Sequence, residues 1–163
     1  MTDAVNFRQA SFVLSAVELS QLPKDTGHEV AFIGRSNAGK SSTINTLTGI
    51  RGLARTSKTP GRTQQINVFS LSESQRLIDL PGYGYAKVPL ATKANWEQTV
   101  NTYLQQRQSL AGLVVIMDIR HPMKALDEKL IEWATQCDLA IHVVLTKADK
   151  LSRGACSNQY QQV

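Results

Sequence analysis

The chain has 163 residues, of which 42% are apolar and 19% are charged, so it fits one folded domain and is not a globally disordered chain. Lys and Arg number 18 against 13 for Asp and Glu, and the formal charge of +5 favours an anionic partner such as a nucleotide, RNA or a phosphate surface. The two cysteines, Cys137 and Cys156, have neither disulfide-framework nor zinc-site spacing, which indicates reduced thiols in a cytoplasmic protein.

Neither a secretion signal nor a membrane span is expected. The first ten residues carry Asp3 and Arg8 and have no apolar signal-peptide core. The longest apolar run, residues 110–117, is far too short to cross a bilayer. We therefore expect an N-terminal extension over residues 1–28, followed by one domain over residues 29–151 of a cytoplasmic monomer.

Short apolar runs alternate with longer helical patterns along the chain. In chain order, we predict a strand at 29–34, a helix at 40–47 that ends at Gly49, a loop at 51–62, strands at 65–69 and 76–80 around a hairpin turn, a helix at 91–108, a strand at 113–117, a helix at 123–136 and a strand at 139–145. This alternation predicts an α/β fold with a mostly parallel sheet and one antiparallel hairpin strand. Ligands of such sheets bind beyond the carboxyl ends of the strands.

A glycine-rich sequence follows the first predicted strand. It consists of Gly34, Arg35, Ser36, Asn37, Ala38, Gly39, Lys40 and Ser41. Four residues between two glycines, followed by Lys-Ser, form the phosphate-loop pattern, in which backbone N–H groups surround an anion at a helix N-terminus. Lys40 would add a positive charge for the β- and γ-phosphates, and the Ser41 hydroxyl is a hard oxygen ligand suited to Mg²⁺.

Two further motifs end predicted strands. The first is Asp79, Leu80, Pro81 and Gly82, and the second is Thr146, Lys147, Ala148 and Asp149. Asp79 can hold Mg²⁺ through water, and the N–H of Gly82 can approach a γ-phosphate. Asp149 can accept the N1–H and the exocyclic amine of guanine, a donor pair that adenine lacks. Taken singly, residues 79–82 could be an ordinary turn at the end of a strand, and residues 146–149 could be a solvated helix cap. Together they favour GTP over ATP, and an ATP-dependent small-molecule kinase is a weaker alternative.

The predicted loop carries a candidate magnesium switch. Thr63 is the preferred ligand and Thr59 the second choice, because a threonine hydroxyl can reach Mg²⁺ when a γ-phosphate closes the loop. The expected nucleotide-binding residues of this segment are Gly61, Arg62, Thr63, Gln64 and Gln65. The alternative interpretation of this segment is a flexible polar loop, which is expected when the site is empty or holds GDP.

In this order the motifs resemble an Era-like GTPase with a Ras-like P-loop domain, and specifically the EngB family (also called YihA or YsxC) of bacterial GTPases. The resemblance covers roughly residues 12–151 and is carried by residues 34–42, 58–64, 79–85, 118–122 and 146–149. The Pro-Gly-Tyr-Gly-Tyr and Arg-His-Pro stretches are specific to this family. The resemblance implies GTP hydrolysis, GTP or GDP with Mg²⁺ on Ser41 and Thr63, and a role in large-subunit (50S) ribosome assembly, cell division and septation.

The resemblance also bears on catalysis. Tyr83 stands where Ras-like enzymes place a water-orienting glutamine, and tyrosine lacks that amide. We therefore expect slow intrinsic hydrolysis, with Lys40, Thr63 and Gly82 supporting the transition state. Asn37 resembles an asparagine that coordinates K⁺ in related GTPases, and its alternative role is to tolerate a turn conformation.

Charge favours an RNA partner. Residues 30–72 contain six cations and no carboxylate: Arg35, Lys40, Arg51, Arg55, Lys58 and Arg62. The loop cations can meet rRNA phosphates of the 50S subunit, or they can form a solvated basic loop.

The C-terminus departs from the family. Fourteen residues follow Asp149, where the family continues through another strand and a helix. Residues 152–163 lack an apolar period, so we expect a non-homologous, disordered tail produced by a frameshift or premature stop. A domain without its last strand and helix would expose the strand at 139–145 as a sheet edge. The alternative function is therefore a truncated, aggregation-prone, non-catalytic fragment that binds nucleotide or RNA weakly at most.

Overall fold

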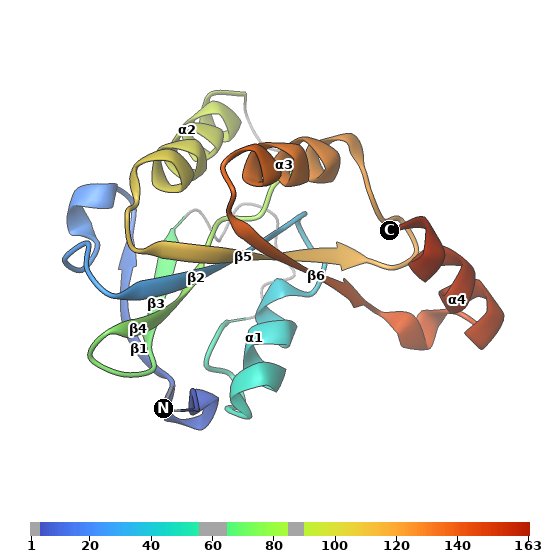
Figure 1. Ribbon diagram of the computed structural model, residues 1–163, viewed down its shortest axis with the longest axis horizontal. Coiled ribbons are helices and arrows are strands. Elements are labelled where there is room, and N and C mark those ends of the chain that lie inside the picture. The colour runs from blue at the N-terminus through green and yellow to red at the C-terminus, as the bar shows by residue number, and fades with distance from the viewer. Residues whose placement is uncertain (1–3, 56–64, 85–89) are drawn as a thin grey trace.

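A computed structural model describes residues 4–55, 65–84 and 90–163, without the side chains of residues 92, 93 and 96 (Figure 1). The strands are β1 (Ser11–Ala16), β2 (His28–Gly34), β3 (Ile66–Ser70), β4 (Gln75–Asp79), β5 (Leu110–Asp118) and β6 (Ala140–Thr146). The α-helices are α1 (Lys40–Thr48), α2 (Leu90–Gln106), α3 (Ala125–Gln136) and α4 (Arg153–Gln162), and short 3₁₀ turns lie at Phe7–Gln9, Leu19–Gln21 and Ala148–Lys150.

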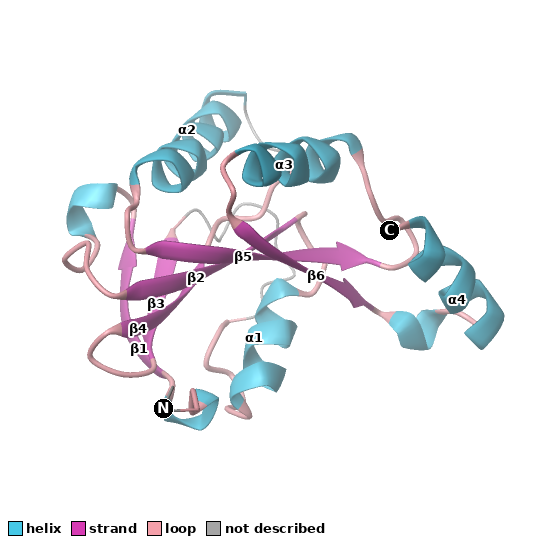
Figure 2. Ribbon diagram, viewed as in Figure 1, coloured by secondary structure: helices cyan, strands magenta, loops and turns pink. Residues whose placement is uncertain are grey.

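One six-stranded sheet organises the fold in the order β1-β3-β4-β2-β5-β6 (Figure 2). The pairs β2–β4, β2–β5 and β5–β6 are parallel, whereas β3 is antiparallel to β1 and β4. Helices α2 and α3 cover one face of the sheet and α1 covers the other. The predicted α/β class, with its mostly parallel sheet and β3–β4 hairpin, is confirmed.

The core consists of two apolar clusters, one on each face of the sheet. Ile33 and Val115 pack on the side of α2 and α3, whereas Phe32 and Ile116 pack on the side of Ile44 in α1. Consecutive strand residues point to opposite faces, so a stretch of strand that is buried against apolar clusters on both sides is apolar at every position. This requirement explains the short apolar runs at residues 30–33 of β2 and 113–117 of β5.

Strand β1 lies within the segment that we expected to be an extension. It pairs with β3 from Ser11 opposite Ser70 to Ala16 opposite Ile66, so the sheet begins well before residue 29. The sequence pattern does not reveal this strand, because four of its six residues are exposed and no inside–outside alternation marks it. The ring of Phe12, although 56% exposed, meets that of Phe69 edge-on with the centroids 6.1 Å apart.

The structure also differs from the expected disordered tail. Residues 153–162 form α4, whose first turn is capped by a hydrogen bond from the Ala155 N–H to Ser152 Oγ at 3.3 Å. None of the residues of α4 is buried, and its polar sequence has no apolar stripe. Hydrophobic periodicity therefore could not predict this helix. In the part of the chain that the structure describes, no helix is long and apolar enough to cross a membrane.

Candidate nucleotide-binding site

The phosphate-loop sequence forms the turn between β2 and α1. A Cβ at Gly34 would lie 2.6 Å from the Ile116 carbonyl oxygen, so β5 requires a glycine there. Asn37 (φ 62°) and Gly39 (φ 97°) adopt left-handed conformations that turn the chain into α1. Gly39 is the N-cap of α1, and no side chain caps this helix end, which leaves first-turn N–H groups able to meet an anion.

Lys40 and Asp79 form an ion pair beneath this turn. Their side chains are only 10% and 2% exposed, and the Asn67 side-chain amide donates to Asp79 Oδ2 at 3.4 Å. Burial lowers the pKa of Lys40 to about 7, so a phosphate beside its Nζ would favour the charged ammonium.

The donor set fits magnesium held together with phosphates. Ser41, in the first turn of α1, and Asp79 supply a hydroxyl and a carboxylate, which are hard oxygen ligands. Over residues 4–55, 65–84 and 90–163, no three His, Cys, Asp or Glu side chains gather into a site that could hold a metal ion. A metal here would therefore need phosphate or water oxygens to complete its coordination.

The segment after β4 packs directly on the phosphate loop. The Tyr83 N–H donates to the Gly34 carbonyl at 3.2 Å, and the Ser36 N–H donates to the Tyr83 carbonyl at 2.7 Å. A Cβ at Gly82 would meet the Ser36 backbone at 3.4 Å. Leu80, Pro81 and Gly82 are buried. The structure thus brings together two motifs that lie about forty residues apart in the chain.

The third motif, after β6, joins the same loop. Thr146 Oγ1 donates to the Ala38 carbonyl and, at 3.1 Å, to the Met117 carbonyl. Lys147 Nζ donates to the Asn37 carbonyl at 2.6 Å. Asp149 is 73% exposed and faces Lys150 Nζ at 3.4 Å, so its carboxylate is accessible to a ligand. Thr146 and Lys147 thus fix the start of this motif to the phosphate-binding turn, and the accessible Asp149 carboxylate follows two residues later.

Asp118, at the end of β5, is a further candidate site residue that none of the predicted binding motifs contains. It accepts hydrogen bonds from Arg120 Nε at 3.0 Å and Nη2 at 2.7 Å, and its Oδ2 lies 3.3 Å from Lys147 Nζ. The Arg120 guanidinium, together with Lys147, holds the pKa of Asp118 well below its usual range. The available signal was a carboxylate at the carboxyl end of a strand beside the phosphate loop.

The candidate magnesium switch lies mostly outside the described residues. Thr59, Gly61, Arg62, Thr63 and Gln64 fall in the undescribed segment 56–64, so their expected roles stay predictions. Gln65 is described; it is exposed and directly precedes β3.

Comparison with known proteins identifies the family. The family model described as "50S ribosome-binding GTPase" matches residues 29–147. The probable GTP-binding protein EngB of Coxiella burnetii is 59% identical over 157 residues, which cover 96% of this chain and 77% of that protein. The chain belongs to the EngB family of GTP-binding proteins. An EngB of Escherichia coli is 58% identical over 159 residues, covering 98% of this chain and 76% of that protein.

A solved structure agrees on the fold. The crystal structure of a probable GTP-binding protein engB superposes with a TM-score of 0.65 at 22% identity, covering 82% of this chain and 79% of that one. This EngB-family chain therefore has the P-loop GTPase fold, and GTP hydrolysis is the activity of its family. The match to the Escherichia coli relative omits only a few residues of this chain, so most of residues 152–163 lies inside it, contrary to the expected non-homologous tail.

Proposed function

We propose that this chain is a cytoplasmic, monomeric GTP-hydrolysing switch that binds GTP or GDP with Mg²⁺ and acts on the 50S ribosomal subunit or its precursor during assembly. Through that role it would support normal cell division and septation. The family membership supports the GTPase part of the proposal, and the description of the matching family model supports the ribosomal part.

One observation carries the nucleotide assignment. Thr146 Oγ1 and Lys147 Nζ both donate to carbonyls of the phosphate loop, at Ala38 and Asn37. These bonds fix the first two residues of the motif to the phosphate-binding turn, and the exposed Asp149 carboxylate follows two residues later. A ligand that satisfies both parts carries phosphates at one end and a purine with paired donors at the other.

Different residues of the site would bind the phosphates, the magnesium ion and the γ-phosphate. The uncapped N-terminus of α1 and the Lys40 ammonium bind the phosphates, and a phosphate that attracts Lys40 releases Asp79 from its ion pair. Ser41, Thr63 and, through water, Asp79 would hold Mg²⁺, which when bound neutralises phosphate charge. Gly82 lies against the phosphate loop, where its N–H would recognise the γ-phosphate.

Base selection tests the assignment directly. Calorimetric titration with Mg²⁺ should show GDP and GTP binding without comparable ATP binding. Asp149→Asn should lose guanine nucleotides and gain xanthine nucleotides, because the amide can donate to the xanthine 2-carbonyl where guanine carries an amine. Lys150→Ala is the matched control, since it removes only the exposed partner of Asp149. Equal binding of ATP and GTP would contradict the proposal.

The ribosomal part predicts salt-dependent binding. Arg35, Arg51 and Arg55 are the described cations of the basic segment beside Lys40, and two of them, Arg51 and Arg55, are exposed. Contacts with rRNA phosphates release counterions, so the affinity for 50S particles should fall steeply between low and moderate salt. Binding that is insensitive to salt would argue against an RNA contact.

One observation favours the alternative of a weakly binding, non-catalytic fragment. Val143, Val144 and Leu145 are only half-buried, whereas their β5 partners Val115, Ile116 and Met117 are buried. The base-binding motif follows β6, so loosening of this edge strand would weaken nucleotide binding. A melting temperature that GDP does not raise would support the fragment, because a ligand that binds the native state stabilises it.

A further inference from the structure

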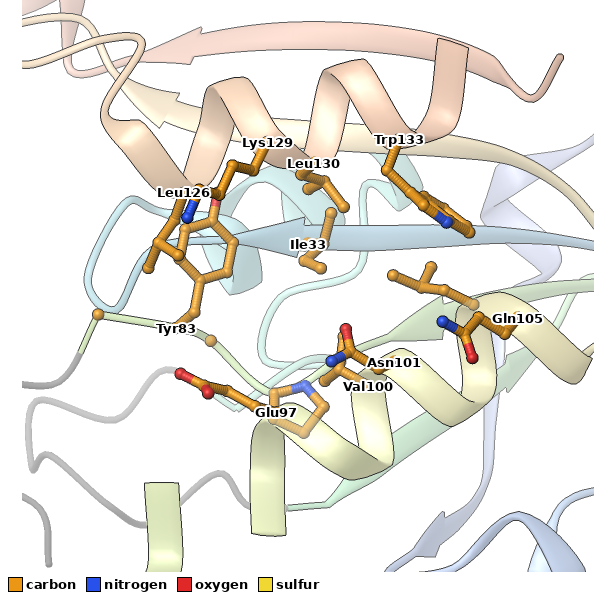
Figure 3. A pocket seen from close by; sticks show the side chains of 14 residues that line it. Ile33, Tyr83, Glu97, Val100, Asn101, Gln105, Leu126, Lys129, Leu130 and Trp133 are labelled. Atoms are coloured by element: carbon orange, nitrogen blue, oxygen red, sulfur yellow. The ribbon is translucent and has the colours of Figure 1, made fainter. Parts of the chain in front are cut away.

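Tyr83 contacts two parts of the molecule at once. Its side chain extends toward α3 and lines a pocket of about 500 Å³ between α2 and α3, which Leu130 and Trp133 also line (Figure 3). There the Tyr83 hydroxyl donates a hydrogen bond to Asp127 Oδ1. Asp127 is 1% exposed, and its second oxygen accepts the Lys124 N–H at 2.9 Å.

The backbone of the same tyrosine is fixed to the phosphate loop. Its N–H and carbonyl bond to Gly34 and Ser36, as described above. Its two neighbours are glycines, and Gly84 has a φ of 80°. Because the flanking residues have no side chains, Tyr83 provides the only side-chain anchor of the tripeptide 82–84.

We propose that Asp127 is a positioning residue for the GTPase reaction. By holding the Tyr83 hydroxyl, it keeps Gly82 against the phosphate loop, where the Gly82 N–H meets the γ-phosphate. This inference rests on the proposed function. Tyr83 itself is directed toward α3, so it acts as an anchor and orients no water.

Loss of the Tyr83–Asp127 bond should affect GTP and GDP binding differently, whereas loss of a purely structural contact should affect both alike. GDP has no γ-phosphate, so a misplaced Gly82 costs GTP binding and turnover but leaves GDP binding intact. Asp127 also caps α3 through its other oxygen, and loss of that cap would lower stability without distinguishing the two nucleotides. Tyr83→Phe removes the anchor and keeps the cap.

A matched control exists at the other end of the sheet. The buried Tyr103 hydroxyl donates to the buried Glu29 carboxylate at 2.8 Å, which is the same kind of bond far from the nucleotide motifs. Tyr103→Phe should lower the melting temperature without changing the ratio of GTP to GDP affinity.

The experiment measures Kd for GDP and for a non-hydrolysable GTP analogue, together with kcat and KM, in the wild-type chain and four variants. These variants are Tyr83→Phe, Asp127→Asn, the double variant and Tyr103→Phe. For Tyr83→Phe we expect the affinity for the analogue to fall roughly 5- to 30-fold with GDP affinity within about twofold, and kcat to fall as well. The double variant should change the ratio of analogue to GDP affinity little more than Tyr83→Phe alone, because both substitutions act on the same Tyr83–Asp127 bond.

The outcomes separate the two claims. If the wild-type chain binds both nucleotides but Tyr83→Phe changes both affinities equally or neither, the anchor is refuted and the proposed function stands. If Tyr103→Phe shifts the ratio as much as Tyr83→Phe, general destabilisation explains the effect and the anchor is again refuted. If the wild-type chain binds neither nucleotide, both proposals fail.

Discussion

Asp118 Oδ2 lies 3.3 Å from Lys147 Nζ, and the same ammonium donates to the Asn37 carbonyl at 2.6 Å. These contacts hold Lys147, which lies in the motif proposed to bind the base, between the end of β5 and the phosphate loop. The aliphatic stem of a lysine held in this way can lie along a base plane.

Asp118→Asn should therefore weaken GDP and GTP binding equally. The pair is partly exposed, with side-chain exposures of 17% and 32%, so the expected loss is about two- to tenfold. Fluorescence titration with both nucleotides measures it. Arg120→Ala is the control, because Arg120 contacts Asp118 from an exposed position and its loss leaves the carboxylate to Lys147. Unchanged affinity in Asp118→Asn would mean that the Asn37 carbonyl alone holds the lysine.

Asn37 provides a test of cation dependence. We expect single-turnover GTP hydrolysis to be faster in KCl than in NaCl, because a potassium ion beside the phosphates can supply positive charge that Tyr83 cannot. Asn37→Asp should alter the dependence, while Asn37→Gly should abolish it and still permit the φ of 62°. Equal hydrolysis rates in KCl and NaCl would mean that Asn37 binds no potassium ion and serves only to adopt the left-handed turn conformation.

The sequence predicted those parts of the molecule whose signals are local. Strand β2 and helix α1 could be placed because an apolar run ends at a glycine turn, and Gly49 ends the helix with a left-handed φ of 67°. By contrast, β1 and α4 lack buried stripes, so no periodicity marked them. The Tyr83–Asp127 bond joins residues 44 positions apart, and spacing within one motif cannot reveal a contact that depends on how α3 packs over the sheet.

Glu29 is the centre of a buried charge network at the amino ends of the central strands. Its carboxylate accepts hydrogen bonds from Arg76 at 2.9 Å, from Arg107 at 2.8 Å and from Tyr103. Glu29→Gln would leave two arginines without their buried counter-charge, which should cost about 3–5 kcal/mol of unfolding free energy. Urea denaturation measures this loss, and Glu132→Gln, on an exposed face of α3, should lie within about 0.5 kcal/mol of wild type. A small effect of Glu29→Gln would mean that the arginines find other partners.

Acid sensitivity should originate at the same end of the sheet. Burial alone would raise the pKa of Asp25, but hydrogen bonds from residues 108 and 109, with the Arg107 charge, lower it to about 2. The Asp25 carboxylate accepts the Ser109 N–H at 2.8 Å and the Gln108 N–H at 3.0 Å.

A carboxylate whose pKa is depressed on folding stabilises the native state above its ordinary pKa of 3.8, and this stabilisation disappears as the pH falls toward 2. Glu29, whose pKa is also lowered, acts in the same direction. The melting temperature should therefore decline steeply below about pH 4, as followed by circular dichroism. Asp25→Asn should be less stable at pH 7 and show a shallower decline. A parallel decline in both proteins would assign the acid transition to other carboxylates.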